Sequence, residues 1–420
     1  MPVVKSIACR KVLNSHVEFT NEFLVHLADG AVGAAASPQG ETVSVYEGKG
    51  EALSPESIVG ILTREGCLDR EVDQPSFDAA LRRHVTDFGR NTTCSISIAF
   101  FNAVNTHRSV YDLWDIPRGQ VSSPRLCLNI LNGGRHAYTN PVLSDFPEYL
   151  LVARTNQVEE VVAWHAELQR AIAERLRHHP KEIVSGHPVH RFATADNREC
   201  FDFLRQVLEE LGLTKHFDLM VDASAGDLRS GIDYEFALTN QARYSGEALV
   251  EYWRELIREY HVAFLEDPFA EDDLASWRGL TGSQEGCAII GDNLYSSDAA
   301  RIRKGAREKW THGVILKPNQ AGTVTDIQQA VEAARTSGQV AITSHRSIST
   351  EETFLSLLTC AYQIGFIKIG PLLTDYSSVI RLNAILRFSE NQSHVEANRH
   401  QHDPARLHGL QCATTVCRDH

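Results

Sequence analysis

The sequence predicts an α/β protein in which an N-terminal α+β domain precedes a closed barrel of parallel strands. The chain of 420 residues is longer than one ordinary domain. Its first hundred or so residues alternate polar and apolar positions and then change to helical spacing. From Leu126 onward, short apolar runs alternate with amphipathic helices, which is typical of successive βα units.

The N-terminal domain is predicted from two periodicities. The stretch NEFLVHLADGAVGAAAS, residues 21–37, alternates polar and apolar side chains, which indicates strands. The stretches PSFDAALRRHVTDFG and CSISIAFFNAVNTH, residues 75–89 and 94–107, have helical spacing. We therefore place an α+β domain at residues 1–120.

Six apolar runs in the second part of the chain each end in a polar or charged residue. The runs are FDLMVD, VAFLED, CAIIGDN, GVILKPN, VAITSHR and GFIKIG, and the residues are Asp222, Glu266, Asp292, Lys317, His345 and Lys368. Their separations of 44, 26, 25, 28 and 23 residues suit successive βα units of a barrel. Every strand of such a barrel delivers its C-terminal end to the face that carries active sites. We place the barrel at residues 121–392 and expect these side chains to meet at its mouth.

Amphipathic helices are predicted around these runs, at residues 158–179, 197–212, 246–260, 323–338 and 349–365. The last begins with Ser-Thr-Glu-Glu, which we expect to cap it. The end of the chain has five histidines, little periodicity and few apolar residues. It predicts a mobile, solvated tail at 393–420; metal binding by the histidines is the alternative.

Composition and charge exclude several classes of partner. A net charge of −13 disfavours nucleic acid, because a binding groove needs clustered Lys and Arg. No apolar run is long enough to span a bilayer, so no membrane partner is expected. The N-terminus, MPVVKSIACRKVL, lacks the apolar segment of a secretory signal, and the nine cysteines include no CxxC pair. We therefore expect a cytoplasmic protein with reduced thiols.

Three of the residues at strand ends are carboxylates, Asp222, Glu266 and Asp292, from consecutive βα units. Carboxylates that converge at a barrel mouth repel one another unless a positive group lies between them. Mg²⁺ prefers oxygen ligands and needs few protein carboxylates, so the set fits Mg²⁺ better than zinc. For any one of them, a helix cap or a solvated loop charge is the alternative.

Short motifs in this chain resemble those of enolases in order and approximate spacing. They are LNILNGGRHA, MVDAS, FLEDPFAEDD, GDNL, ILKPNQAGT, SHRS and FIKIG, preceded by KVLNSHVEFTNEFLVHLADG and ASPQGETVSVYEG. The resemblance runs to about residue 390. It implies an N-terminal α+β capping domain on a modified (β/α)8 barrel, and a Mg²⁺-dependent homodimer that dehydrates 2-phosphoglycerate.

The resemblance also implies a role for each matching residue. It assigns the metal to Asp222, Glu266 and Asp292, and removal of the α-proton to Lys317. The residues that would hold the substrate's carboxylate and phosphorus group, or complete the site, are His136, His345, Arg346, Ser347 and Lys368. Structural alternatives stay open: His345 with Arg346 as a capping pair, His136 as a loop residue, and Lys368 against a core carboxylate.

The sequence departs from the enolase pattern at the positions that act on the leaving hydroxyl. Enolases have a Gly-Asp-Glu-Gly-Gly loop there, whereas this chain has VSGHPVHRFATADN, with His187 on or near the Glu position and His190 close by. Asp145 replaces a second Glu, and Thr42 in PQGETVS is the nearest match to a loop Ser. Asn293 stands where a second Asp usually follows the metal Asp.

These departures favour a specialised enzyme, because the half that abstracts the proton is kept and the leaving-group half is changed. The predicted activity is a Mg²⁺-dependent dehydratase acting on a small anionic phosphorus-containing carboxylic acid, as in enolase-like enzymes of phosphonate natural-product pathways. His187 is the predicted general acid, with His190 and Asp145 as alternatives. Glycolytic enolase and a non-catalytic enolase-like binding protein are the competing hypotheses.

Overall fold

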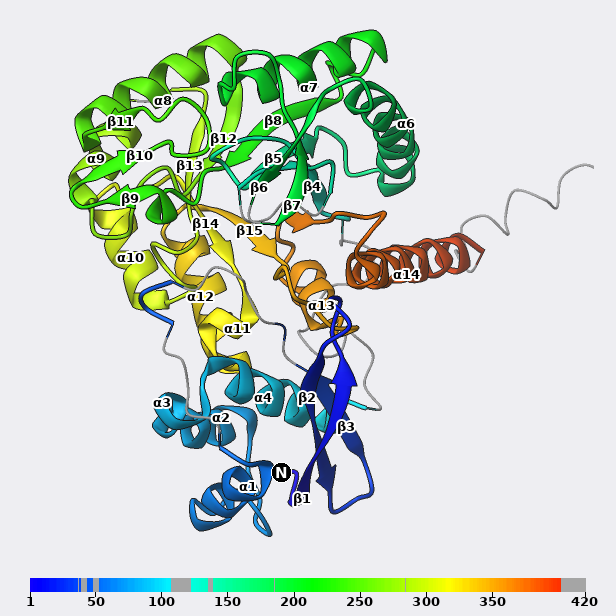
Figure 1. Cartoon of the computed structure of the whole chain (residues 1–420). Coiled ribbons are helices and arrows are strands. Elements are labelled where there is room, and N and C mark those ends of the chain that lie inside the picture. Colours follow the sequence, from blue (N-terminus) through cyan, green and yellow to red (C-terminus); the bar gives the residue numbers. More distant parts are fainter. Residues whose placement is uncertain are drawn as a thin grey trace, which may run out of the picture.

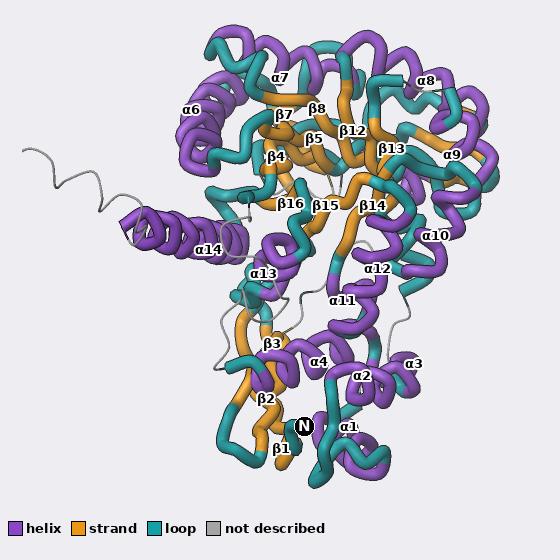
Figure 2. The backbone as a smooth tube through the Cα atoms, turned by 180° about the vertical axis from the view of Figure 1, so that it is seen from behind, coloured by secondary structure: helices purple, strands orange, loops and turns teal. Residues whose placement is uncertain are grey.

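The computed structural model describes residues 1–36, 38, 44–47, 53–106, 122–134, 139–184, 186–283 and 285–401, with the side chains of the last helix described as far as Phe388. The N-terminal domain lies at one end of the molecule and the barrel at the other (Figure 1). The last helix projects beside them, and the view from behind shows the same arrangement (Figure 2).

The N-terminal domain is a three-stranded antiparallel sheet covered by helices, as predicted. The strands are β1 (Val4–Leu13), β2 (Phe19–Leu27) and β3 (Val32–Ala36), in that order. Alternate residues of β2, Phe23, Val25 and Leu27, are buried, which places one face of the sheet in the core. At Gly33 an added Cβ would lie 2.1 Å from the backbone N of Ala103, so glycine lets a helix pack closely on the sheet. The helices are α1 (Pro55–Arg64), α2 (Gln74–Arg83), α3 (Val85–Phe88) and α4 (Arg90–Val104).

The barrel is closed, in the strand order β12-β13-β14-β15-β16-β4-β5-β8. Its strands are β4 (Arg125–Asn132), β5 (Glu148–Ala153), β8 (Phe217–Asp222), β12 (Val262–Glu266), β13 (Ala288–Gly291), β14 (Gly313–Leu316), β15 (Val340–Ser344) and β16 (Phe366–Ile369). Apolar side chains from these strands fill the interior, among them Leu150, Met220, Ile290 and Ile342. The predicted barrel is confirmed.

One strand differs from the predicted parallel arrangement. β5 pairs antiparallel with both of its neighbours, β4 and β8. The described residues between β4 and β5 contain no helix to carry the chain back across the barrel, so the chain returns in the opposite direction. As a result, the first residue of β5, Glu148, lies at the end of the barrel where the other strands finish, opposite Asp222.

The predicted helices are present, and their capping follows the sequence. The side chains of Ser245, Asp298 and Thr323 accept hydrogen bonds from the first turns of α8, α10 and α12. The helix expected to start near 349 begins only at Phe354, where the Glu352 carboxylate accepts the backbone N–H at 2.9 Å. The helices are α6 (Val158–Leu176), α7 (Arg198–Glu210), α8 (Gly246–Tyr260), α9 (Leu274–Thr281), α10 (Ala299–Arg307), α11 (Pro318–Ala321), α12 (Val324–Thr336), α13 (Phe354–Ala361) and α14 (Tyr376–Gln401).

Smaller elements complete the barrel domain. A hairpin of β6 (Lys181–Val184) and β7 (His187–His190) lies between α6 and α7. A short 3₁₀ helix (Ala225–Leu228) and a small sheet of β9 (Arg229–Ser230), β10 (Asp233–Glu235) and β11 (Arg243–Tyr244) follow β8. Helix α14 continues to Gln401, beyond residue 393 where the tail was predicted to start. The domain boundaries and the mobility of the tail stay predictions.

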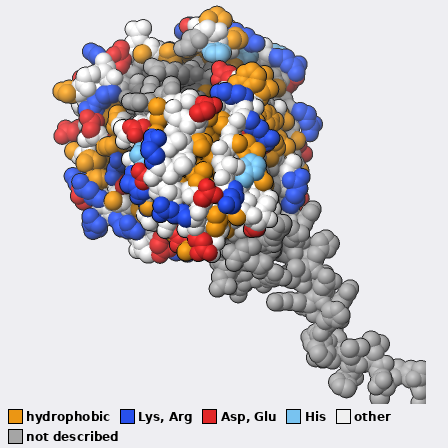
Figure 3. All heavy atoms as spheres, turned by 90° about the horizontal axis from the view of Figure 1, so that it is seen from below, with side chains coloured by type: hydrophobic (Ala, Val, Ile, Leu, Met, Phe, Trp, Pro, Cys, Tyr) orange, Lys and Arg blue, Asp and Glu red, His pale blue; other side chains and the backbone are white. Residues whose placement is uncertain are grey.

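Charge is evenly mixed on the face seen from below, where acidic and basic side chains are interspersed (Figure 3). None of the helices in the described part of the chain is both long and apolar enough to cross a membrane.

Candidate active site

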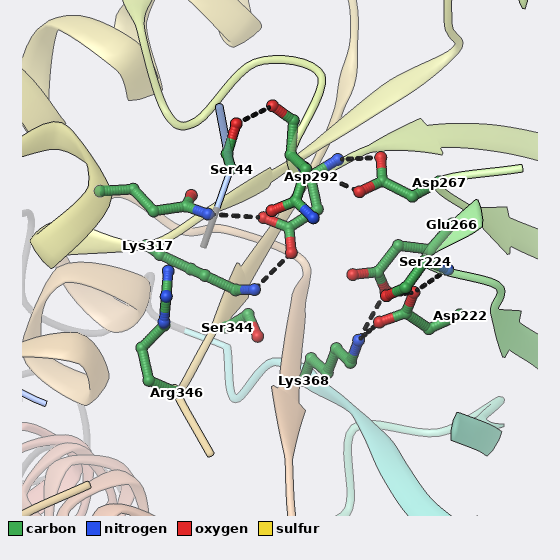
Figure 4. Close-up of polar contacts among 12 residues, drawn as sticks. Ser44, Asp222, Ser224, Glu266, Asp267, Asp292, Lys317, Ser344, Arg346 and Lys368 are labelled. Carbon is green, nitrogen blue, oxygen red and sulfur yellow. Dashed lines mark hydrogen bonds and ion pairs between the residues drawn. The ribbon is translucent and has the colours of Figure 1, made fainter. Parts of the chain in front are cut away.

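The strand ends bring the predicted charged residues together at the barrel mouth. Asp222 and Glu266 are the last residues of β8 and β12, and the two are paired in register. Asp292, Lys317 and His345 follow β13, β14 and β15 directly, while Lys368 lies inside β16. In Figure 4, Lys368 points toward Asp222 and Glu266, and Lys317 points toward Asp292. We call Glu148, Asp222, Glu266, Asp292, Lys317 and Lys368 the lysine cluster.

Lys368 is buried among three carboxylates of the described chain. Its Nζ lies 2.8 Å from Asp222 Oδ2, 2.7 Å from Glu266 Oε2 and 2.7 Å from Glu148 Oε2. Burial alone would lower the pKa of Lys368, but Asp222, Glu148 and Glu266 outweigh burial and raise the pKa well above its ordinary value. Lys368 is therefore a fixed positive charge.

The two carboxylates beside Lys368 differ in their electrostatics. Burial favours the neutral form of Asp222, but Lys368 outweighs it and lowers the pKa of Asp222. Burial and the neighbouring charge of Asp222 raise the pKa of Glu266 well above its ordinary value. Glu266 is fully buried, and its second oxygen, Oε1, has no hydrogen-bond partner. A cation would stabilise Glu266 in its charged form.

Lys317 forms an ion pair with Asp292 in a second part of the cluster. The other oxygen of Asp292 accepts a hydrogen bond from Gln320 Nε2 at 3.0 Å. The backbone behind it is held by Asp267, whose carboxylate accepts the N–H groups of Asp292 and Asn293 at 2.9 and 2.8 Å. Asp292 is thus fixed on its backbone and on both side-chain oxygens.

Arg346 meets the N-terminal domain instead of open solvent. Its Nη1 lies 3.3 Å from each carboxylate oxygen of Glu47, and the side chains are only 4% and 8% exposed. Gln320 Nε2 also reaches Glu47 Oε1 at 3.3 Å, and Ser44 Oγ donates to the backbone oxygen of Asn293 at 2.9 Å. Residues 44–47 therefore cover the mouth next to the predicted anion-binding arginine.

His345 and Ser347 line a cavity of about 240 Å³ together with Glu148, Asn129 and Asp375. His345 Nδ1 lies 3.8 Å from Asp375 Oδ2. Burial lowers the pKa of His345 to about 4, and the opposing effect of Asp375 is smaller. His345 is therefore neutral near pH 7 and can bind a ligand as a polar group rather than as a charge.

Asp145 lies near the mouth, but hydrogen bonds to neighbouring segments occupy its carboxylate. Oδ1 accepts the Leu238 N–H at 2.8 Å, and Oδ2 accepts Asn197 Nδ2 at 3.1 Å and the Thr239 hydroxyl. Asp145 also lines a second cavity, of about 460 Å³, beside Ser224 and Arg229. In this structure Asp145 joins three segments of the chain.

The predicted histidines lie on the β6–β7 hairpin. His187 is exposed at the start of β7 and pairs with Val184, whereas His190 is buried where its backbone bonds to Pro141 and Leu143. Burial lowers the pKa of His190, which favours its neutral form. We call β6, β7, residues 139–147 and Asn197 the hairpin region. Thr42 and His136 lie outside the described residues.

Two acidic residues of the site were missed from the sequence, Glu148 and Glu47. Glu148 begins the apolar run EYLLVA, so its charge stands before a strand rather than after one. Glu47 belongs to a segment of the N-terminal domain, 299 residues before the arginine that it contacts. The sequence feature that could have pointed to Glu148 is its position only three residues after Asp145, the residue that we had chosen as the acid of this segment.

The chemistry of the lysine cluster fits a hard divalent cation. It supplies three buried carboxylates from neighbouring strands, one of them with an unpartnered oxygen. As the side chains stand, no group of three acidic, His or Cys residues in the described ranges is arranged to hold a metal ion. The ammonium groups of Lys317 and Lys368 contact oxygens of the same carboxylates. The assignment of Mg²⁺ to Asp222, Glu266 and Asp292 stays a prediction.

Comparison with known proteins gives the family. The family model described as "Enolase, C-terminal TIM barrel domain" matches residues 120–403. This chain belongs to the enolase family. The "Enolase" of Acidothermus cellulolyticus is 29% identical over 418 residues, which cover 93% of this chain and 95% of that protein.

Membership of the enolase family agrees with the fold and with the residues at the mouth. The match covers every strand of the barrel and all members of the lysine cluster. Enzymes of this superfamily generally use Mg²⁺, and a lysine base with Mg²⁺ is their usual arrangement. The family therefore supports an enzyme of the enolase superfamily.

Proposed function

We propose that the protein is a Mg²⁺-dependent lyase that removes the proton α to a carboxylate and eliminates a β-hydroxyl to give an enolpyruvate product. The substrate would be a 2-phosphoglycerate-like or phosphonate acid, as for carboxyphosphonoenolpyruvate synthase of phosphonate natural-product biosynthesis. The observation that carries this proposal is the lysine cluster, in which two lysines face different carboxylates at one barrel mouth. One lysine can act as the base, and the other can stabilise the negative charge that develops on the substrate carboxylate.

Lys317 is the proposed base. A neutral Lys317 takes the α-proton, and the electron pair of the C–H bond moves toward the substrate carboxylate. Lys368 stays charged and stabilises the negative charge that develops there. Bound Mg²⁺ would supply further positive charge for the same carboxylate. The same electron pair then forms the C=C bond of the product as the C–O bond breaks, and a general acid, for which we keep His187, gives its proton to the departing hydroxyl.

The groups proposed to bind the phosphorus group are Arg346, Ser347 and His345. Arg346 is buried and forms an ion pair with the Glu47 carboxylate. A dianionic group of the substrate would therefore displace that carboxylate or bind Arg346 beside it. The cavity of about 460 Å³ beside Asp145 also includes Ala223 and Ser224, which directly follow the proposed metal ligand Asp222, so we place any extra bulk of the substrate there. Our proposal of a specialised substrate rests on the changed leaving-group positions in the sequence, and glycolytic enolase is the second candidate.

The test follows α-proton exchange and product formation separately. The protein is incubated with Mg²⁺ in deuterated water with 2-phosphoglycerate, and in parallel with a phosphonate acid of the same carbon skeleton. Faster turnover of the phosphonate acid, as kcat/KM, supports the specialised enzyme, and faster turnover of 2-phosphoglycerate identifies an ordinary enolase. If neither acid undergoes α-proton exchange, the remaining hypothesis is a non-catalytic enolase-like binding protein.

The metal assignment has its own test. Glu266→Gln keeps the shape of the side chain and removes one charge, so the Mg²⁺ dissociation constant measured by calorimetry should rise by more than the roughly 10–100-fold expected for a group outside the ligand set. Glu332→Gln, on the exterior helix α12, is the control and should bind Mg²⁺ as the unchanged protein does. Unchanged affinity in Glu266→Gln would place the metal elsewhere.

We also propose that the protein acts in the cytoplasm as a homodimer, as the family resemblance implies. Buried cysteines of the described ranges such as Cys127, Cys200 and Cys287 are free thiols, which suits a reducing compartment. Sedimentation at micromolar protein concentration would measure the mass of the assembly, and a single-chain mass would contradict the dimer.

A further inference from the structure

A charged cavity lies between the N-terminal domain and the helices on the outside of the barrel. It has a volume of about 370 Å³ and is lined by α2, α3 and α4 on one side and by α10, α11 and α12 on the other (Figure 1). Small-molecule sites generally measure roughly 300–1,000 Å³, so the cavity is large enough for a metabolite. We call it the arginine cavity, because Arg82, Arg90 and Arg303 line it.

The three arginines differ in what holds them. Arg82 Nη1 donates to Asp326 Oδ1 at 2.7 Å and so joins α2 to α12. Arg90 Nη1 donates to the last two backbone oxygens of α11 at 2.7 and 3.0 Å. Arg303 is exposed, and in the part of the chain that the structure describes it makes no hydrogen bond or ion pair. Arg82 and Arg90 therefore connect the two domains, whereas the charge of Arg303 has no structural use.

The aspartates of the arginine cavity do not cancel its positive charge. Asp326 is paired across the domains, and its Oδ2 accepts the Thr323 hydroxyl at 2.7 Å. Asp298 Oδ1 accepts the backbone N–H of Arg301 at 2.8 Å and caps α10. Three arginines thus line the cavity with two aspartates that already accept hydrogen bonds. The net charge of the lining is positive and favours an anion.

A fourth arginine adds to this positive charge. Burial lowers the pKa of Arg301, and the positive charge of Arg90 acts in the same direction, although Asp298 opposes both. Arg301 Nη2 is buried and has no hydrogen-bond partner. Because Arg90 and Arg301 repel each other, an anion beside Arg90 would reduce a repulsion that the described side chains leave in place.

The first turn of α10 supplies further donors. Asp298, Ala299 and Ala300 line the cavity, and the first N–H groups of a helix have no partner within it. The Asp298 side chain accepts the N–H of Arg301, which leaves those of Ala299 and Ala300 for a ligand. The first two N–H groups of α12 differ, because they donate to side chains of α4 and α2. Arginine forks beside the positive end of a helix suit a phosphate group.

The arginine cavity adjoins the groups that hold the proposed base. Ser297 lines it, and Ser297 Oγ accepts the backbone N–H of Lys317 and donates to Gln320 Oε1, both at 2.9 Å. Gln320 Nε2 in turn donates to Asp292 Oδ1 at 3.0 Å. Arg90 binds the backbone of the same short helix, α11. An anion that draws the Arg90 guanidinium away would release the end of α11 that holds Asp292.

We propose that the arginine cavity binds a phosphorylated small molecule and that this ligand slows proton abstraction at the barrel mouth. Arginine donors and helix N–H groups recognise the phosphate, and the remaining volume accommodates a carbon skeleton. The binding site stands on the cavity alone. The inhibitory effect rests on the proposed function, because it acts through the position of Lys317.

The first experiment measures binding and needs no substrate. Pyrophosphate is the probe and is titrated by calorimetry into the full chain without Mg²⁺. Arg303→Gln removes a charge that holds no other part of the protein, so the dissociation constant should rise by about 10–100-fold, as expected for lost hydrogen bonds to a charged group. Arg307→Gln removes the same charge one turn further along α10, outside the cavity, and is the matched control.

Two results of that titration would overturn the proposal. One is the absence of binding at millimolar pyrophosphate. The other is equal affinity in Arg303→Gln and Arg307→Gln, which would place the anion elsewhere, for example at Arg346 of the barrel mouth.

The second experiment measures inhibition. α-Proton exchange is followed with the better of the two acids, at saturating concentration and constant free Mg²⁺, so that competition at the barrel mouth has no effect. Pyrophosphate should lower exchange by roughly 5-fold or more in the unchanged protein and in Arg307→Gln. Arg303→Gln should exchange normally without pyrophosphate and require about 10–100-fold more of it for the same inhibition.

The two experiments separate failure of this proposal from failure of the proposed function. Exchange that continues at the same rate with pyrophosphate bound would contradict the inhibitory role. If the unchanged protein shows no exchange with either acid, while Arg303→Gln still weakens pyrophosphate binding, the proposed function fails and the binding site is supported.

Discussion

The lysine cluster and the hairpin region occupy the same barrel mouth but satisfy their carboxylates in different ways. In the lysine cluster, Asp292 pairs with Lys317, and Asp222 pairs with Lys368. In the hairpin region, Asp145 is held by a backbone N–H, an amide and a hydroxyl. A metal or a charged substrate can take the place of an ammonium group, whereas replacing three fixed neutral donors would require the surrounding segments to move. The first arrangement suits chemistry and the second suits structure.

The largest effect is expected for Lys317→Ala. Both α-proton exchange and elimination need the enolate, so both should fall together, by about 10⁴-fold, the upper range for a positioned base. Exchange in deuterated water followed by proton NMR gives the measurement. Lys304→Ala, in an exposed position of α10, should behave as the unchanged enzyme. If Lys317→Ala retains exchange, Lys368 becomes the candidate base.

His187→Ala tests whether the hairpin region takes part in the chemistry at all. If His187 protonates the departing hydroxyl, elimination should slow by about 10²–10³-fold while exchange, which needs only the lysine cluster and the metal, continues. The two rates are measured in the same sample. If elimination continues at the unchanged rate, the hairpin region has only a structural role. Another group must then be the general acid.

A pH effect on stability is expected from the helix that packs beside the hairpin region. His165 of α6 is buried, accepts a hydrogen bond from Gln169, and Gln169 in turn accepts one from Asn140 at 2.8 Å. Burial lowers the pKa of His165 from 6.5 to about 4. Between these values the unfolded chain binds a proton that the folded chain does not, so stability rises with pH from 4 to 6.5 and is lost on acidification.

The size of that effect is up to roughly 3.5 kcal/mol, from about 1.4 kcal/mol for each unit of the pKa difference between 6.5 and about 4. Urea unfolding at pH 4.5 and 7.5 should give a smaller pH dependence for His165→Gln than for the unchanged protein. His178→Gln is the matched control, because its imidazole is 78% exposed just beyond the same helix. Equal pH dependence in both variants would mean that His165 is protonated in the folded state.

The smallest effect is expected for Asp145→Asn. The new amide group would face the Leu238 N–H or the Asn197 amide, so at least one hydrogen bond is lost and a donor is left unsatisfied, at a cost of about 1–3 kcal/mol. Urea unfolding measures the loss, and α-proton exchange should stay near its original rate. A large loss of exchange with unchanged stability would place Asp145 in the chemistry.

The residues at strand ends could be predicted because barrel geometry converts chain order into spatial position. A run of buried residues followed by a charge is visible in the sequence, and parallel strands bring such charges to one face, as for Glu266 and Lys317. The same rule did not predict Glu148, because β5 runs antiparallel to its neighbours. The charged residue that lies at the mouth is therefore the first residue of the strand and not the last. Strand direction depended on a connection whose course the sequence did not reveal.

Contacts between segments that are distant in the chain could not be predicted from the sequence, for a different reason. The position of Asp145 follows from motif spacing, but its partners Leu238 and Thr239 lie more than 90 residues later in the chain. No local pattern reports that their donors will occupy its oxygens. The helices, by contrast, carry their own periodicity and caps, so α8 was predicted with both of its ends.

The ion pair between Glu47 and Arg346 restricts how this protein can exchange parts with its relatives. Arg346 belongs to the barrel and Glu47 to the N-terminal domain, and each is almost completely buried by the other's surroundings. A chimaera with an N-terminal domain from a relative that lacks this acid would remove the Glu47 carboxylate from a buried guanidinium, and breaking a buried ion pair in this way costs about 3–5 kcal/mol. The two domains are therefore expected to have been inherited together, and grafting either one should also transfer this pair.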